Sequence, residues 1–150
     1  MKAVIQIVTN ADVFCENKTV GEIKKGLLVL LGVESTDTEK EAELMASKIA
    51  ALRIFPDEND KMNLSVTDVD GEILAVSNFT LCADASHGRR PSYSDAMRPE
   101  GANVSYEKFC DALLKNGVRK VEKGVFGGDM KVTLTNDGPI TLILDTAIWS

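Results

Sequence analysis

Histidine is almost absent from this sequence: His87 is the single one among 150 residues. A Ser-His-Asp or Cys-His catalytic group would have to be built around this one residue, which lies in a loop-like stretch. The motifs of the nucleophile elbow, the P-loop, the dinucleotide-binding glycine loop and the HExxH zinc site are absent too. An enzyme with this sequence therefore works with few titratable side chains.

Cysteine is also scarce, and Cys15, Cys82 and Cys110 are odd in number and far apart. No pair has the spacing of a zinc site, and a disulfide framework is not expected. We therefore predict three free thiols in a reducing cytoplasm, and we predict neither a bound metal nor a cofactor.

Long apolar segments are missing as well. The longest apolar run, residues 27–33, is too short to span a membrane. In the N-terminal stretch, apolar and polar residues alternate, and the polar residues Asn10 and Asp12 follow. This pattern is unlike the apolar core of a secretory signal peptide. These absences predict a soluble cytoplasmic protein without a membrane partner.

The overall composition is that of an ordinary folded domain, with 44% hydrophobic and 27% charged residues and a formal net charge of −6. A chain of this length favours one domain, spanning residues 1–150, that needs no disulfide or metal to fold. The negative net charge argues against a protein that coats DNA or RNA, because such proteins are typically basic. A local contact with the end of an RNA remains open.

Apolar patterning predicts a series of strands, at residues 3–8, 12–15, 19–23, 27–33, 73–77, 118–122, 130–135 and 141–145. The runs at 27–33 and 73–77 are continuous, which is typical of strands buried on both faces.

Two helices are expected between these strands. The first begins near Thr38, which has capping-box spacing to Glu41, and ends at residues 54–56. The second runs from the N-cap Ser105 to Gly117. Two helices are too few to cover both faces of a large sheet. We therefore predict a mixed α/β fold with both helices on one face of a β-sheet and a second sheet behind it, in α/β/β layers.

Residues 83–103 contain glycine and proline without any periodicity. An irregular stretch of this length inside a compact domain is often functional. His87, Arg89 and Arg90 cluster near one end of it. Such a cluster fits contact with a phosphate backbone, and it fits equally an ion pair within the fold or across a dimer.

Polar residues follow the buried strand at 73–77, in the order Ser77-Asn78-Phe79-Thr80-Leu81. Small polar side chains and backbone amides at the point where an apolar strand surfaces can line a site. The same hydroxyls can instead bond only the local backbone.

A second polar segment, Asn136-Asp137-Gly138-Pro139-Ile140-Thr141, lies between two strand-like runs. Asn-Asp-Gly in that setting predicts a β-hairpin. Pro139 does not fit a hairpin, because it has no N–H with which to begin the return strand. X-Pro is also the one kind of peptide bond in which the cis form is common.

Together, the two segments resemble the Ser-Gln-x-Thr-Leu and Asn-x-Gly-Pro-x-Thr motifs of the D-aminoacyl-tRNA deacylase family. The resemblance runs from end to end and includes the segments at residues 26–33, 52–55, 61–65, 88–92 and 126–130. Either motif alone would be weak, whereas both in this order, with these flanks, make the match specific.

The resemblance implies a homodimer with two equivalent active sites at its interface, acting on the 3′ end of aminoacyl-tRNA. It implies that Gly138 and Pro139 of one subunit, in a cis peptide, enter the other subunit's pocket and exclude L-amino acids. Rejection of the wrong hand would let one site hydrolyse many D-aminoacyl-tRNAs, and also glycine mischarged on tRNA-Ala. Phe126 and Met130 match residues that hold the terminal adenosine.

The catalytic candidates are Ser77, Asn78, Phe79 and Thr80. Backbone N–H groups near Phe79 and Thr80 would stabilise the oxyanion, and the 2′-hydroxyl of the terminal ribose would position or activate the attacking water. A rival mechanism makes Thr80 the nucleophile, but no base is visible to activate it. The remaining substrate-binding candidates are Gln6, Asn136 and Thr141.

Two residues depart from the family pattern. Asn78 replaces the usual glutamine, and Ile7 follows Gln6 where the family has an arginine that helps to hold the Gly-Pro loop. The sequence leaves open how firmly Gly138 and Pro139 are fixed in this chain, and how strictly L-amino acids are rejected.

Two other functions remain open at this point. One is a non-catalytic module of the same fold that binds RNA ends or free D-amino acids; the retained Ser77, Thr80, Gly138 and Pro139 weigh against it. The other is a stand-alone domain that edits L-amino acids, because a related fold is attached to some archaeal threonyl-tRNA synthetases. The Gly-Pro pair weighs against that alternative.

Overall fold

The computed structural model describes residues 1–149, which form a mixed α/β fold. The elements in chain order are β1 (Lys2–Cys15), β2 (Lys18–Ile23), β3 (Gly26–Gly32), α1 (Glu39–Ala51), β4 (Phe55–Pro56), β5 (Met62–Leu64), β6 (Glu72–Ser77), the 3-10 helix η1 (Phe79–Cys82), α2 (Pro99–Lys115), β7 (Val121–Lys123), β8 (Lys131–Asp145) and the 3-10 helix η2 (Thr146–Ile148).

Six strands form one bent sheet in the order β2-β1-β3-β6-β7, with β8 paired to β1. Residues 2–8 of β1 pair with β3, and residues 11–15 pair with β2. β8 runs antiparallel to both parts of β1. The parallel pairs β3–β6 and β6–β7 complete the sheet, and β4 and β5 form a separate two-stranded sheet.

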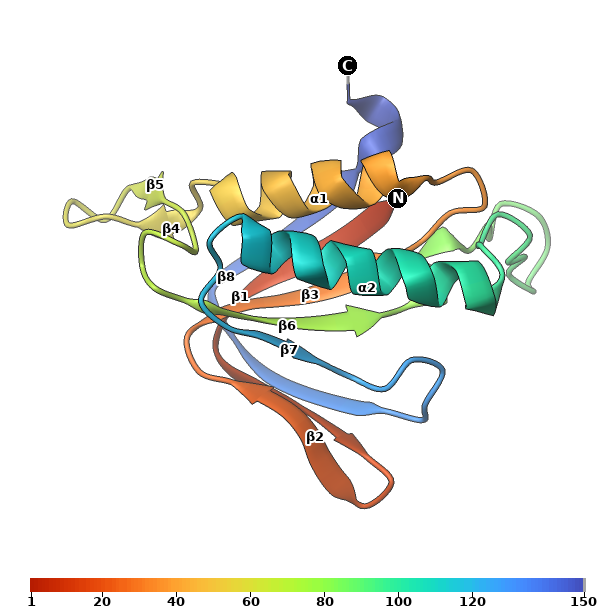
Figure 1. Ribbon diagram of the computed structural model, residues 1–150, viewed down its shortest axis with the longest axis horizontal. Coiled ribbons are helices and arrows are strands. Elements are labelled where there is room, and N and C mark those ends of the chain that lie inside the picture. The colour runs from red at the N-terminus through yellow and green to blue at the C-terminus, as the bar shows by residue number, and fades with distance from the viewer. Residues whose placement is uncertain (150) are drawn as a thin grey trace.

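Helices α1 and α2 lie side by side on one face of the sheet, and β2 with part of β8 folds away on the other side (Figure 1). This arrangement confirms the predicted α/β fold with both helices on one face. The predicted second sheet is the folded-over part of the same six-stranded sheet, because β1 and β8 are long enough to belong to both layers.

Strands β3 and β6 are buried on both faces, as their continuous apolar sequences predict. One face contributes to a helix-side core, whose members include Leu27, Val29, Leu31, Met45, Ile49, Ile73, Tyr106 and Phe109. The other face contributes to an inner cluster, made of Val8, Ala11, Val13, Ile23, Leu28, Leu74 and Val76 with Leu30, Met130, Val132 and Leu134 packed against it. The fold therefore has two apolar layers separated by the same strands.

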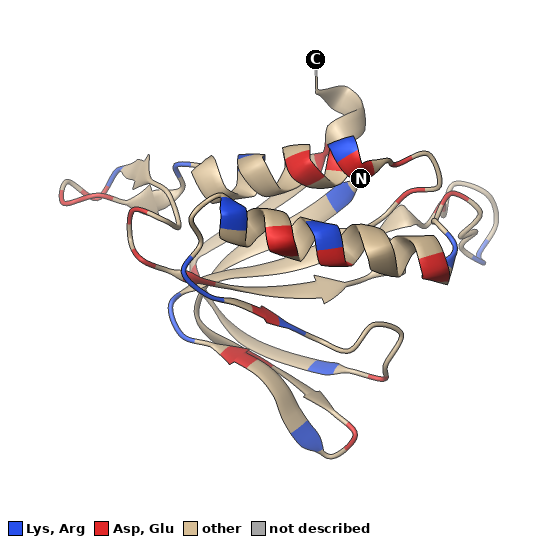
Figure 2. Ribbon diagram, in the orientation of Figure 1, with Lys and Arg blue, Asp and Glu red and all other residues tan. Residues whose placement is uncertain are grey.

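Helix α1 begins at the predicted cap. The Thr38 N–H donates to the Glu41 carboxylate over 2.6 Å, and the Thr38 hydroxyl caps the first turn in return. Charged side chains lie along both helices and in the loops, whereas the strands beneath the helices are almost free of them (Figure 2). Each helix therefore turns its apolar side to the sheet and its charged side to solvent.

The predicted N-cap at Ser105 is wrong, because α2 begins at Pro99 and Ser105 is a buried residue inside the helix. Proline is well suited to the first turn, where its fixed φ matches the helix and its missing N–H is not needed. The apolar stripe that marks the helix in the sequence starts only at Tyr106, so the stripe misses the largely exposed first turns. Gly117, at φ +95°, follows the helix end as predicted.

Cys15, Cys82 and Cys110 are buried free thiols, as predicted. Burial raises the pKa of the Cys110 thiol to about 12, and burial also raises the pKa of Cys82. Both thiols are therefore protonated at neutral pH, which makes them poor nucleophiles. Within residues 1–149, no helix is long and apolar enough to cross a membrane.

Candidate active site

A cavity of about 790 Å³ opens where β6 ends, beside the start of α2 and the start of β8. Its apolar floor comes from the inner cluster, through Leu28, Leu30, Val76, Met130, Val132 and Leu134. The walls come from the loop before α2, the start of α2 and the loop before β8, through Tyr93, Ala96, Met97 and Arg98, then Pro99 and Ala102, and then Phe126, Gly127, Gly128 and Asp129. The cavity is thus an opening into the inner cluster at the carboxyl end of β6.

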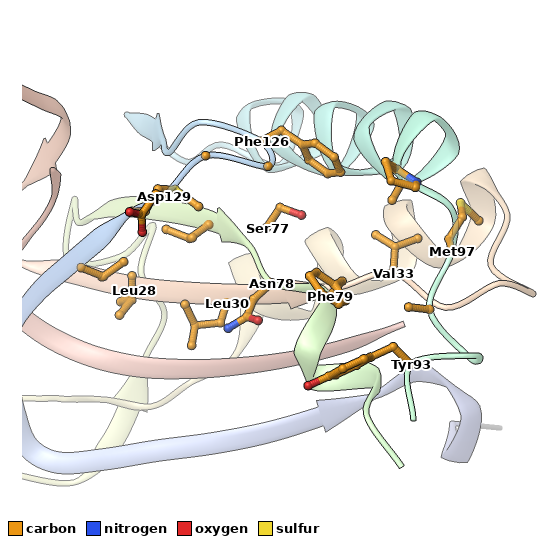
Figure 3. A pocket seen from close by; sticks show the side chains of 18 of the residues that line it. Leu28, Leu30, Val33, Ser77, Asn78, Phe79, Tyr93, Met97, Phe126 and Asp129 are labelled. Carbon is orange, nitrogen blue, oxygen red and sulfur yellow. The ribbon is translucent and has the colours of Figure 1, made fainter. Parts of the chain in front are cut away.

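Ser77, Asn78 and Phe79 line this cavity at the point where β6 surfaces. In Figure 3 they lie between Phe126 and Tyr93. The chain turns into η1 after Asn78, whose N–H still continues the sheet by donating to the Leu31 carbonyl over 2.8 Å. The polar groups at the end of the buried strand β6 therefore lie at the edge of a cavity that is mostly apolar.

Thr80 lies next to the cavity and not in its lining, and its side chain is exposed. Its hydroxyl donates to the Asn78 side-chain oxygen. The N–H groups of Phe79 and Thr80 open η1 and donate no hydrogen bond to another residue within 1–149. Two backbone donors are thus free beside the cavity, while the Thr80 hydroxyl has a neutral partner and no base.

The segment Asn136–Thr141 is not a hairpin, and that prediction is wrong. Val8 pairs with Asn136 and Gln6 pairs with Thr141, so both flanking runs pair with β1, one after the other. Residues 137–140 of β8 lie opposite the single residue Ile7 of β1 and form a bulge. The hairpin signal fails because β1 is long enough to accept both runs end to end, which leaves neither free to fold back on the other.

Two side-chain contacts close the base of this bulge. The Asn136 amide donates both protons, to the Ile7 carbonyl at 2.9 Å and to the Ile140 carbonyl at 3.0 Å. The Gln6 amide donates to the Thr141 hydroxyl over 3.1 Å. The Ile7 side chain is buried in the helix-side core, so in this chain the Asn136 amide ties the bulge to β1.

Gly138 and Pro139 sit at the exposed part of the bulge. Their peptide bond is cis, and Gly138 has φ +119°, a conformation that residues with a Cβ rarely adopt. Neither residue lines the cavity of its own chain.

The structure therefore brings only part of the predicted set together. The residues that line the cavity are Gln6, Ser77, Asn78, Phe79, Phe126 and Met130. The residues outside it are Thr80, Asn136, Gly138, Pro139 and Thr141. Within residues 1–149, no group of three His, Cys, Asp or Glu side chains is arranged to hold a metal ion.

Sequence reasoning missed the wall formed by Tyr93, Met97 and Arg98. These residues belong to the stretch 83–103, whose lack of periodicity was the one available signal. His87 is exposed and does not line the cavity. Tyr93 contacts Phe79 edge to face, with ring centroids 5.2 Å apart and an interplanar angle of 70°.

The chain is similar to known proteins along nearly its whole length. Residues 4–145 match the sequence family described as D-Tyr-tRNA(Tyr) deacylase. Proteins named D-aminoacyl-tRNA deacylase from Thermosipho melanesiensis and Thermosipho africanus are 55% and 56% identical to it over 146 residues, which is 97% of this chain and 97% of each relative.

Two solved structures have the same fold. One, described as c-Myc DNA Unwinding Element Binding Protein, is 41% identical with a TM-score of 0.89 over 97% of this chain and 98% of its own. The other, described as a probable eukaryotic D-amino acid tRNA deacylase, is 16% identical with a TM-score of 0.82 over 95% and 97%.

Proposed function

This chain belongs to the D-Tyr-tRNA(Tyr) deacylase family, and we propose that it hydrolyses the ester bond between a D-amino acid and the 3′ end of tRNA. The observation that carries the proposal is the cavity at the end of β6, where Ser77, Asn78 and Phe79 face Phe126 and Met130 across an apolar space. Glycine mischarged on tRNA-Ala is a second substrate of the same site, because glycine has no side chain to exclude.

The terminal adenosine of the tRNA occupies the part of the cavity beside Phe126 and Met130. An aromatic ring and a thioether next to aliphatic side chains suit an adenine base, which buries a flat apolar surface. The ester then lies near Ser77 and Phe79, where polar groups enter the cavity.

Catalysis at this ester rests on backbone groups. The free N–H groups of Phe79 and Thr80 stabilise the negative charge that develops on the carbonyl oxygen. An aminoacyl ester is already activated, so the 2′-hydroxyl of the terminal ribose suffices to orient or activate the attacking water. The scarcity of titratable side chains at the cavity fits this mechanism and does not fit a nucleophile with its own base.

The hand of the amino acid is selected by Gly138 and Pro139 of a second copy of the chain. These residues are exposed and do not reach their own cavity, so a role at the ester requires a partner subunit. Within residues 1–149, β8 pairs only with β1, which leaves its other edge unpaired, and Ile143 on β8 is 79% exposed. An open edge with an exposed apolar side chain favours association with another chain. The bulge of one subunit then closes the cavity of the other.

Deacylation of D-Tyr-tRNA, Gly-tRNA and L-Tyr-tRNA by the purified protein tests the proposal. We expect hydrolysis of the first two and little of the third. Equal hydrolysis of the D and L esters would instead identify an editing domain without chiral selection. No hydrolysis of any ester would leave a non-catalytic binding module.

A further inference from the structure

We propose that Phe79, Tyr93 and Arg98 form a binding site for the nucleotide that precedes the terminal adenosine of the substrate. This inference rests on the proposed function, because it extends the path of the RNA beyond the cavity. We call Phe79 and Tyr93 the aromatic rim. Its ligand is a single-stranded nucleotide, with the base on the aromatic rim and the connecting phosphate on Arg98.

The aromatic rim is exposed to an unusual degree. Phe79 is 54% exposed and Tyr93 is 42% exposed, although they contact each other and both line the cavity. By contrast, Tyr106 and Phe109 are completely or almost completely buried. Exposed aromatic rings beside a binding site are the usual platform for unpaired bases, because every base has a flat face that stacks.

The charges that line the cavity favour a phosphate at the end that contains Arg98. Arg98 is the one cationic residue and Asp129 the one anionic residue that line the cavity. Within residues 1–149, Arg98 forms no ion pair and no side-chain hydrogen bond. In Figure 3, Asp129 lies toward the same end of the view as Leu28, and Tyr93 and Met97 lie toward the opposite end. Arg98 follows Met97 in the chain, so a phosphate is attracted to the end of the cavity that contains Met97 and Arg98 and repelled from the Asp129 end.

This placement agrees with the connectivity of the substrate. The terminal ribose carries the ester at its 3′ position and the connecting phosphate at its 5′ position. With adenine beside Phe126 and the ester beside the N–H groups of Phe79, the free wall of the cavity is the one that contains Tyr93 and Arg98. The preceding nucleotide leaves along that wall.

The test compares D-tyrosine esterified to adenosine with D-tyrosine esterified to the dinucleotide CpA. For the wild-type protein, stacking of one base predicts a kcat/KM that is roughly 5- to 100-fold higher for the dinucleotide ester. Tyr93→Ala should lower kcat/KM much more for the dinucleotide ester than for the adenosine ester and so remove this advantage, whereas Tyr93→Phe should keep it. An equal loss on both esters, or no loss on either, would overturn the proposal.

Salt dependence tests the role of Arg98. For binding of unesterified CpA, Arg98→Gln should reduce the slope of log K against log salt by about 0.7, the value for one phosphate contact in a single strand. Lys61→Gln is the control, because Lys61 lies between β4 and β5 and not at the cavity. Equal slopes for the Arg98 variant and the wild type would contradict the phosphate contact.

Two further outcomes separate this inference from the proposed function. If the wild-type protein hydrolyses neither ester but binds CpA more tightly than adenosine in a Tyr93-dependent way, the deacylase proposal fails and the nucleotide site stands. If Tyr93→Ala instead converts a dimer into monomers during sedimentation, the aromatic rim is a subunit contact and the inference fails.

Discussion

The two faces of strand β3 carry the same kinds of side chain and meet different surroundings. Leu27, Val29 and Leu31 are fully buried in the helix-side core, where large side chains from α1 and α2 fill the space. Leu28 and Leu30 point to the inner cluster, and both line the cavity. The helix-covered face is filled, whereas the face covered by the folded-over β8 retains an opening.

The difference follows from what covers each face. The helices supply Met45, Tyr106 and Phe109, which are almost completely buried. β8 supplies Val132 and Leu134, which are shorter and only partly buried. The filled core therefore lies on one face of the strands, and the proposed substrate site lies on the other.

Leucine-to-alanine changes on the two faces of β3 should give the largest contrast. Leu27→Ala should lower the free energy of unfolding by about 2–5 kcal/mol, because it opens a void in a filled core. Leu30→Ala should cost clearly less, since its side chain already borders a space, and it should raise KM. Urea unfolding and steady-state kinetics measure both effects. Equal losses of stability in the two variants would contradict the difference between the two faces of β3.

The two ends of β6 differ in the same way. At its start, the Glu72 carboxylate is buried and accepts the Lys24 N–H at 2.8 Å and an Arg119 N–H at 2.8 Å. Chiefly the Lys24 hydrogen bond, with Lys120 and Arg119 assisting, holds the pKa of Glu72 below its usual value. At its far end, the polar groups face the cavity.

Glu72→Gln should therefore lower stability by about 1–3 kcal/mol at neutral pH without changing deacylation. A lowered pKa means that the contribution of Glu72 is present above its unfolded pKa and is lost as pH falls through the folded pKa. Unfolding measured from neutral pH to below pH 4 should show the difference between wild type and variant shrinking. A constant difference would contradict this account.

Asn136→Asp should reduce chiral selection. The change keeps the shape of the side chain but removes both protons that tie the bulge to the Ile7 and Ile140 carbonyls. We expect the ratio of D-Tyr-tRNA to L-Tyr-tRNA hydrolysis to fall by about tenfold or more, equivalent to the loss of one or two hydrogen bonds.

Asn10→Asp is the matched control for that variant, because within residues 1–149 the Asn10 amide donates a hydrogen bond only to the neighbouring Thr9 hydroxyl. Its D-to-L ratio should equal that of the wild type. If both variants retain full selection, Asn136 does not hold the bulge in the position that selects the D-amino acid.

Thr80→Ala should have the smallest effect. The Thr80 hydroxyl donates to Asn78 and lies outside the cavity lining, so kcat should stay within about threefold of the wild type, whereas removing a true nucleophile costs several orders of magnitude. Single-turnover kinetics with D-Tyr-tRNA provide the measurement. A collapse of kcat, together with an acyl group trapped on Thr80 of the wild-type protein, would establish covalent catalysis instead.

The layers of helices and strands can be predicted from the sequence, because apolar runs and helix caps are local patterns. Continuous apolar runs identify β3 and β6 as strands buried on both faces, and the capping box of Thr38 and Glu41 marks the start of α1. The start of α2 at Pro99 is not predictable from an apolar stripe, because its first turns are largely exposed.

The site is less predictable, because pairing between distant segments decides it. The bulge at residues 137–140 exists because β1 pairs with both halves of β8, which a local hairpin signal cannot reveal. Tyr93 and Arg98 reach the cavity through an irregular loop, and no sequence period marks them. Motifs identify Ser77 to Thr80 and Gly138-Pro139, but only the fold shows that the two groups are apart within one chain.

That separation makes mixed dimers the most direct measurement of the central claim. Leu30→Trp should block the cavity of its own subunit, and deletion of Gly138 and Pro139 should remove the bulge. Neither homodimer should hydrolyse D-Tyr-tRNA with selection against L-Tyr-tRNA. In a mixed dimer, the subunit with the open cavity receives the intact bulge of its partner, so D-selective hydrolysis should return. A mixed dimer that behaves only as the average of the two homodimers would contradict selection across the interface.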